Sequence, residues 1–225
     1  MKTLVVVGHP DVANSSTQGF FKHAAKEEPQ VTWHVLRAPF DPLKEHQLLW
    51  EADRIVLEFP LYWYSVPAVM KDWIDQIFDE ELLGESGQRL AGKEFGVVVT
   101  TGRALKEFAP GQSQGFTLAE LLRPLQALAN ETKMTYLTPL TIGQFTRLGK
   151  KERLELAVSY RQYLTAEKPG HLATSVAWLV ERLNKLAKEH EDQAPGYLGL
   201  VAVLLDNQEQ LADLGVNLTL LGEDD

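Results

Sequence analysis

The sequence contains no cysteine among its 225 residues. This absence excludes disulfide bonds, thiolate catalysis and cysteine-ligated zinc or iron–sulfur sites. Basic residues are also few, because 22 Lys and Arg stand against 31 Asp and Glu and leave a net charge of −9. Such a chain is a poor candidate for nucleic-acid binding, in which neutralised phosphates supply most of the affinity.

Long apolar segments and targeting signals are missing as well. No apolar run approaches the roughly 18 residues that a membrane span requires. The first residues lead directly into an apolar strand, without the charged and then apolar pattern of a secretory signal, so we expect a cytoplasmic protein. The histidines show no metal-ligand spacing with one another, and we expect no metal site.

Residues 191–225 differ in composition from the rest of the chain. They carry eight acidic residues and no Lys or Arg, yet they include an apolar run over 197–205. A disordered acidic tail is short of such aliphatic residues. We therefore divide the chain into a domain over 1–167 and a C-terminal extension over 168–225. Within the extension we expect a helix over 171–188, ordered packing of 197–221 on its own subunit, a dimer mate or another protein, and fraying of 223–225.

Apolar runs alternate with helical patterns along the first domain. Strands are predicted at 3–8, 31–36, 54–59, 95–101 and 134–140, the last of them broken at Pro139. Helices are predicted at 17–28, 43–52, 67–78, 117–130 and 150–167, with a further break at 194–196. This alternation predicts an α/β fold, a doubly wound five-stranded parallel sheet with helices on both faces. Ligands of such sheets bind beyond the carboxyl ends of the strands. The loops at 9–16, 60–66 and 101–116 meet that condition.

Two of these loops have distinctive residues. Ser15, Ser16 and Thr17 bring hydroxyls to the start of a helix, which suits a phosphate, although a simple helix cap explains the same residues. The second loop holds three successive aromatics, Tyr62-Trp63-Tyr64. Three consecutive side chains of an extended segment cannot all point one way, so at least one is expected to face solvent or a planar ligand.

Several segments together resemble the flavodoxin-like NAD(P)H:quinone oxidoreductases. The most specific is Phe-Pro-Leu-Tyr-Trp-Tyr-Ser-Val-Pro-Ala-x-Met-Lys-x-Trp-Ile-Asp at 59–75, accompanied by Gly-His-Pro at 8–10, Thr-Thr-Gly at 100–102 and Phe-Thr-Leu-Ala-Glu-Leu-Leu-Arg-Pro at 116–124. This family includes DT-diaphorase, the modulators of drug activity and the ancillary flavoproteins of glutathione-gated potassium efflux. The resemblance covers roughly residues 1–166. It implies a flavodoxin-like fold, a bound FMN or FAD, and usually a homodimer with the flavin at the subunit interface.

The resemblance also assigns cofactor-binding residues. The matching positions are His9, Ser15, Ser16 and Thr17 for the phosphate, Pro60, Leu61, Tyr62, Trp63 and Tyr64 for the ring, and Thr100, Thr101 and Gly102 for its pyrimidine side. Gln18 stands where the family often has Asn. FMN is favoured over FAD, because the chain has no obvious insertion between its second and third strands to house an adenosine.

Two positions depart from the family pattern and are the candidates for a catalytic role. Arg103 replaces a second glycine, and its charge would either lie beside the flavin N1/O2 edge or point outward. Phe108 lies where many relatives have Tyr or His; it can stack on a ring but cannot donate a proton.

The leading hypothesis is a flavin-dependent NAD(P)H oxidoreductase that reduces quinones or related electrophiles by ping-pong hydride transfer, with the flavin supplying the chemistry. The alternative is a flavin-binding regulatory subunit of a glutathione-gated potassium efflux antiporter, which would have a membrane transporter as partner. A one-electron carrier fits the acidity of the chain but not the motif at 59–75.

Overall fold

The computed structural model describes residues 1–84 and 88–221, with side chains up to residue 211. The chain divides into two compact units, Met1–Thr165 and Ala166–Asp225. Within the described ranges, no helix is both long and apolar enough to cross a membrane.

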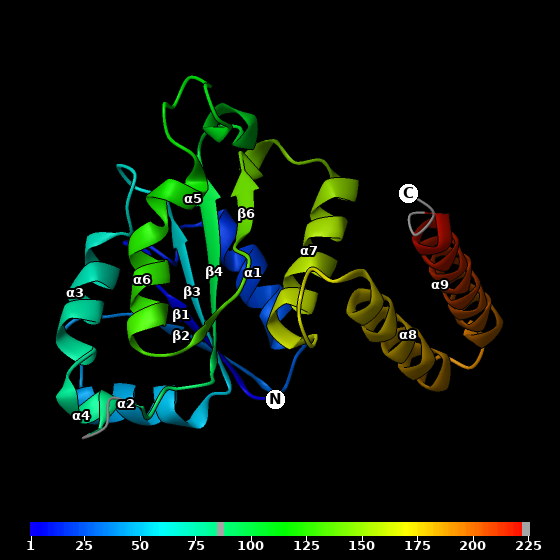
Figure 1. The fold of residues 1–225 in the computed structure, drawn as a ribbon. Coiled ribbons are helices and arrows are strands. Elements are labelled where there is room, and N and C mark those ends of the chain that lie inside the picture. The colour runs from blue at the N-terminus through cyan, green and yellow to red at the C-terminus, as the bar shows by residue number, and fades with distance from the viewer. Residues whose placement is uncertain (85–87, 222–225) are drawn as a thin grey trace. The chain divides into compact units, whose positions relative to one another are not determined.

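The first unit is built on a parallel sheet with the strand order β2-β1-β3-β4-β5, and β6 also pairs with β4 (Figure 1). The strands are β1 (Thr3–Val7), β2 (Val31–Val35), β3 (Arg54–Pro60), β4 (Glu94–Thr101), β5 (Thr135–Tyr136) and β6 (Leu140–Gly143). An order of 2-1-3-4-5 is the flavodoxin-like one. The predicted fold class is confirmed.

The fifth strand, predicted at 134–140 with a break at Pro139, is two short strands, and the second runs on to Gly143. β5 and β6 share the edge of β4, and residues 137–139 separate them. Pro139 has no N–H for a ladder hydrogen bond, so pairing stops before it and resumes at Leu140. The predicted helix at 117–130 is likewise two helices, α5 (Leu118–Leu121) and α6 (Arg123–Glu131), because Pro124 offers no N–H to continue α5.

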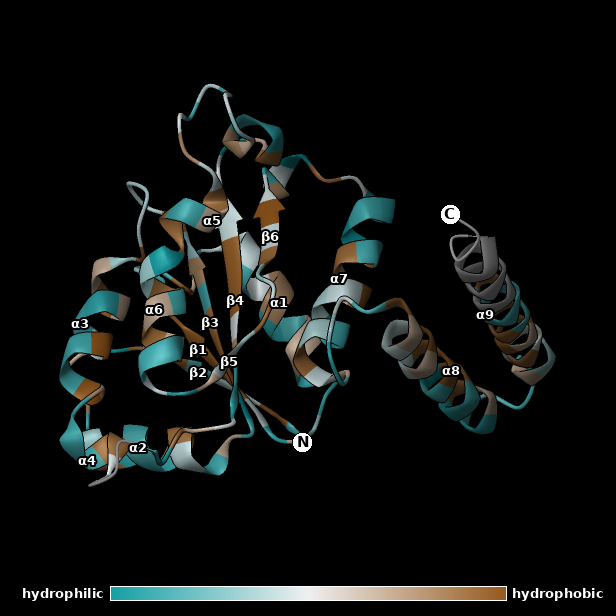
Figure 2. Cartoon of the chain, viewed as in Figure 1, coloured by the Kyte–Doolittle hydropathy of each residue, from teal (hydrophilic) through white to brown (hydrophobic). Residues whose placement is uncertain are grey.

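Helices cover both faces of the sheet, and each face has its own core. Along β1, Leu4 and Val6 belong to one core, and Val5 and Val7 to the other. The first core is covered by α2 (Pro42–Glu51), α3 (Ala68–Ile77), α4 (Glu80–Leu83) and α6, and the second by α1 (Ser16–Lys26) and α7 (Lys150–Thr165). Figure 2 shows mostly apolar strands between helices with polar outer faces. Burial on both faces explains why the strands are apolar runs without alternation.

The second unit is a pair of helices, α8 (Leu172–Glu189) and α9 (Ala194–Leu221), which pack against each other. The predicted break at 194–196 is wrong: α9 begins there, because proline is well tolerated in the first turn of a helix. Half-buried side chains recur along α9 at Tyr197, Val201 and Leu204, a helical spacing that places them toward α8. Residues 223–225, for which fraying is predicted, lie outside the described residues.

A carboxyl group lies inside the second core. Glu58 of β3 is fully buried, and the hydroxyl of Tyr160 donates to its Oε2 over 2.6 Å. Burial raises the pKa of Glu58 to about 8, against the opposing hydrogen bond of Tyr160 and the indole of Trp33. The native state therefore holds a proton on Glu58 at pH values where the unfolded chain has released it.

We predict that Glu58→Gln removes a pH dependence of stability. Between pH 5 and 7.5 the native protein binds one more proton at this site than the unfolded chain, so its stability falls as pH rises. The difference in free energy of unfolding, variant minus wild type, should increase by roughly 1.4 kcal/mol for each pH unit in this window. Above pH 8 this difference should become constant. Urea titrations at several pH values measure this gain, and parallel profiles for the two proteins would contradict it.

The packing of α9 on α8 predicts different effects for two adjacent residues. Leu204 is half-buried, whereas Leu205 is exposed. Leu204→Asp places a charge in the apolar contact and should accelerate amide hydrogen exchange over 194–211 by roughly tenfold or more. Leu205→Asp is the matched control and should leave exchange nearly unchanged. Equal exchange rates in the two variants would show that α9 does not use this face.

Candidate functional site

Loops that are distant in the sequence meet at the carboxyl edge of the sheet. They line a hollow of about 390 Å³. The lining residues are His9, Ser15, Thr17, Gln18, Pro60, Leu61, Tyr62, Thr100, Thr101, Gly102, Gln144, Phe145, Thr146 and Arg147. Nine of the twelve residues that the sequence assigned to a cofactor are among them; Ser16, Trp63 and Tyr64 are not.

The loop after β1 contains a serine that caps α1 and a histidine with a defined tautomer. The Ser15 hydroxyl caps α1 by accepting from the Gln18 amide over 3.2 Å. The Asp11 amide donates to Nδ1 of His9 over 3.0 Å, so the neutral His9 ring carries its proton on Nε2. Burial lowers the pKa of His9, which favours this neutral form at pH 7. His9 is thus a hydrogen-bond donor without a charge.

Gln18 is an unsatisfied group in the same place. Its side chain is 1 % exposed, it lines the hollow, and its Oε1 has no hydrogen-bond partner. An unpaired buried polar atom costs about 1–3 kcal/mol. Such an atom at the wall of a hollow points to a ligand that supplies a donor.

The aromatic loop after β3 is a strained two-residue turn. Tyr62 and Ser65 exchange two backbone hydrogen bonds of 3.0 Å, and the residues between them, Trp63 and Tyr64, have φ of 46° and 65°. Turns of this kind ordinarily use Asn and Gly, because bulky residues are disfavoured in the left-handed region. All three aromatics are exposed, and Trp63 reaches 94 %. The prediction that at least one of them leaves the core is confirmed.

The loop after β4 joins the site through its backbone. The amide of Leu61 donates to the carbonyl of Thr100 over 2.8 Å, which ties this loop to the aromatic one. The Thr101 hydroxyl donates to the carbonyl of Arg103, whose side chain is exposed and does not line the hollow. Phe108, in the short helix η1 (Leu105–Phe108), is buried and does not line it either.

A fourth wall was missed by the sequence reasoning. Residues 144–147 follow β6 and include the short helix η2 (Phe145–Arg147). The Gln144 amide donates to the carbonyl of Thr101 over 2.8 Å, which brings this turn to the carboxyl edge. Because the fifth strand was predicted to end at 140, the loop after it was not placed at that edge. If the strand had been predicted to end at Gly143, residues 144–147 would have been placed at the carboxyl edge.

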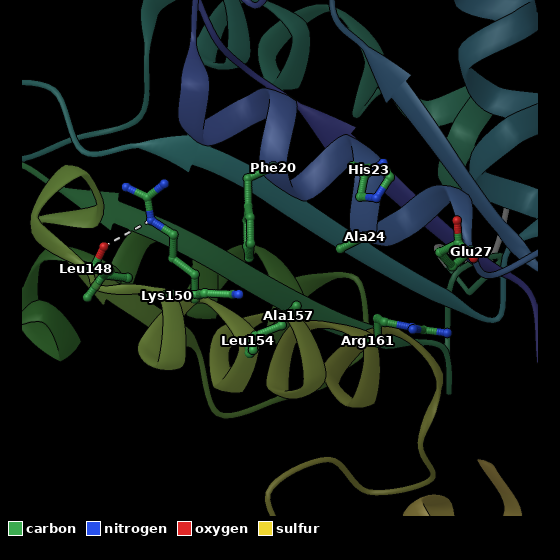
Figure 3. Close-up of a pocket in the computed structure, with 10 residues that line it drawn as sticks. Phe20, His23, Ala24, Glu27, Leu148, Lys150, Leu154, Ala157 and Arg161 are labelled. Carbon is green, nitrogen blue, oxygen red and sulfur yellow. Dashed lines mark hydrogen bonds between the residues drawn. The ribbon is translucent and has the colours of Figure 1, made fainter. Parts of the chain in front are cut away.

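A second hollow of about 600 Å³ lies between α1 and α7 (Figure 3). Its apolar side chains include Phe20, Leu148 and Leu154, and its rim carries Lys150, Arg153 and Arg161. It contains none of the predicted site residues. Among the residues that the structure describes, no three His, Asp or Glu side chains could hold a metal ion.

The chain is similar to known proteins over its first unit. The model of a family described as having a flavodoxin-like fold matches residues 1–165. The uncharacterized NAD(P)H oxidoreductase YrkL of Bacillus subtilis is 35% identical over 173 residues, which are 74% of this chain and 99% of that protein. Proteins named as ancillary proteins KefG of glutathione-regulated potassium-efflux systems also match, one from Cronobacter sakazakii at 32% identity.

Two solved structures extend the comparison. A NADPH-quinone reductase from P. pentosaceus has a TM-score of 0.71 at 46% identity, covering 73% of this chain and 98% of its own. The general stress protein 14 of Treponema denticola, solved in complex with FMN, has a TM-score of 0.65 at 26% identity, covering 73% and 96%. The family match, which spans most of the chain, shows that this protein belongs to the family with the flavodoxin-like fold.

Proposed function

We propose that the protein is an oxidoreductase that binds FMN in the hollow at the carboxyl edge and transfers hydride from NAD(P)H to a quinone or a related electrophile. One observation carries this assignment: residues from four separate loops line one hollow, and one of them, Gln18, has a buried amide oxygen without a partner. The relatives named as an NAD(P)H oxidoreductase and a NADPH-quinone reductase support the reaction class.

The residues present fit a flavin mononucleotide. The capped start of α1 with Ser15 and Thr17 suits a phosphate, because helix amides and hydroxyls donate there. A ribityl hydroxyl would supply a donor for the unpaired oxygen of Gln18. Thr100, Thr101 and Gly102 line the part of the hollow that would meet the polar edge of the ring. The FMN-bound general stress protein 14 supports this cofactor.

The protein's own groups hold and orient, while the flavin, when bound, supplies the hydride chemistry. His9 donates a hydrogen bond through Nε2 without adding charge. Tyr62 and Leu61 offer apolar surface for the ring. Phe108 and Arg103 do not line the hollow, so neither is assigned a catalytic role.

The strained turn supports a functional site at this edge. Left-handed backbone at two bulky residues costs about 1–3 kcal/mol each and persists where function requires it. Trp63 and Tyr64 present aromatic surface beside the hollow, which suits stacking by a nicotinamide and then a quinone. We further propose, from the family resemblance, that the protein acts as a homodimer in the cytoplasm.

A second candidate is an ancillary subunit of a potassium-efflux system, which the KefG relatives favour. The two functions differ in what they require. An enzyme of the first kind reduces a quinone with NAD(P)H and needs no partner protein. An ancillary subunit changes ion flux through a transporter. Flux through a co-expressed antiporter, with and without this protein, measures the second function directly.

We predict that the purified protein is yellow and holds about one FMN per chain. Anaerobic NADH or NADPH should bleach it, and a quinone should restore the colour. Tyr62→Ala should lower FMN content, because it removes apolar surface from the hollow. Tyr197→Ala, in the extension, is the control and should keep full content. A colourless protein that takes up neither FMN nor FAD would contradict the proposed function.

The strain in the aromatic turn gives a second prediction. The double variant Trp63→Asn/Tyr64→Gly suits the left-handed backbone and removes little buried surface from Trp63. The free energy of unfolding of the flavin-free protein should rise by about 1 kcal/mol, while quinone turnover falls. Tyr62→Asn, in the same turn but without positive φ, should bring no gain in stability. A loss of stability in the double variant would mean that the turn is not strained.

A further inference from the structure

The hollow at the carboxyl edge has an electrostatic character opposite to that of the whole chain. Among its described lining residues, Arg147 is the one side chain with a permanent positive charge, and none is a carboxylate. The chain as a whole has a net charge of −9. The guanidinium of Arg147 would therefore attract a negatively charged group of a ligand in this hollow.

The short helix η2, which carries Arg147, packs against α1. The ring of Phe145 lies 5.1 Å from that of Phe20 and 6.3 Å from that of Phe21, so η2 packs on the first turns of this helix. The Arg147 amide donates to the carbonyl of Gln144 over 2.8 Å, which closes the turn. Arg147 therefore shares the hollow with Ser15, at the end where helix amides favour an anion.

The neighbouring cations belong to the other hollow. Arg153 lies over the ring of Phe145 at 5.0 Å, and its Nε donates to the carbonyl of Leu148 over 3.0 Å, the bond dashed in Figure 3. Lys150 lines the hollow between α1 and α7 (Figure 3). Arg153, a residue of α7, therefore lies over the ring of Phe145, while Arg147 lines the hollow at the carboxyl edge.

We infer that Arg147 is the residue that recognises the terminal phosphate of the flavin and makes the site selective for FMN over riboflavin. This inference rests on the proposed function. Guanidinium groups bind phosphate oxygens through two parallel N–H donors, and such charge-assisted bonds are stronger than neutral ones. The side-chain oxygen of Gln18, a residue 1 % exposed in the same wall, has no hydrogen-bond partner and marks the adjoining space as a ligand site independently of the charge.

The test compares two flavins that differ only in the phosphate. Dissociation constants of FMN and riboflavin are measured by flavin fluorescence for the wild type and for Arg147→Gln, Arg147→Lys and Lys150→Gln. Arg147→Gln should weaken FMN binding by roughly 10- to 100-fold and leave riboflavin binding within about twofold. Arg147→Lys should restore part of the FMN affinity. Lys150→Gln removes the same charge three residues away and should alter neither constant.

Each other outcome overturns the inference. If Arg147→Gln weakens both flavins equally, the residue supports the fold of the site and does not read the phosphate. If FMN affinity is unchanged, the phosphate is bound without it. If the wild type binds riboflavin and FMN equally well, the site has no phosphate selectivity. A wild type that binds neither flavin overturns the proposed function as well, which separates the two failures.

Discussion

Burial of the parallel sheet on both faces governs most of this structure. Each crossover between parallel strands lays a helix on the sheet, so the strands must be apolar throughout and their backbone polar groups must pair within the ladder. β1 is buried along its whole length, and β3 is buried as far as Phe59, with Arg54 and Glu58 as its charged side chains. Because the strands run the same way, the loops that follow them gather at one edge. The fold thereby builds a site from segments that are far apart in the chain.

The protein is acidic overall, but the described lining of its candidate site has no acidic side chain. Among the described residues that line the hollow none is a carboxylate, and their polar groups include hydroxyls, amides and one guanidinium. His9 offers a neutral hydrogen-bond donor at the same edge. Under the proposed function, this arrangement would let one end of the hollow bind an anion while the other end accommodates an uncharged planar group.

Glu58 shows that the same buried sheet tolerates a titratable group. Its carboxyl lies among apolar side chains two residues before Pro60 at the site edge, and the Tyr160 hydroxyl is its hydrogen-bond donor. Burial stabilises the protonated form, so the core remains neutral at the cost of a pH-dependent stability. Glu58 therefore affects the stability of the fold, and it does not line the hollow.

The sequence by itself determined the alternation of strands and helices and three of the four loops at the site. These follow from local patterns: apolar runs, a Ser15 cap, and an aromatic motif bounded by Pro60 and Pro67. The flavodoxin-like class was implied by the resemblance of these motifs to a known family. The tertiary structure decided what depends on distant pairing. Pairing with β4 extends β6 to Gly143, and residues 144–147, which include Arg147, therefore lie at the carboxyl edge. The left-handed turn at Trp63 and the unpaired oxygen of Gln18 were also beyond local reading. Bulky residues rarely adopt positive φ, so the residue types do not predict such a turn, and whether a buried oxygen finds a partner is decided only by the folded surroundings.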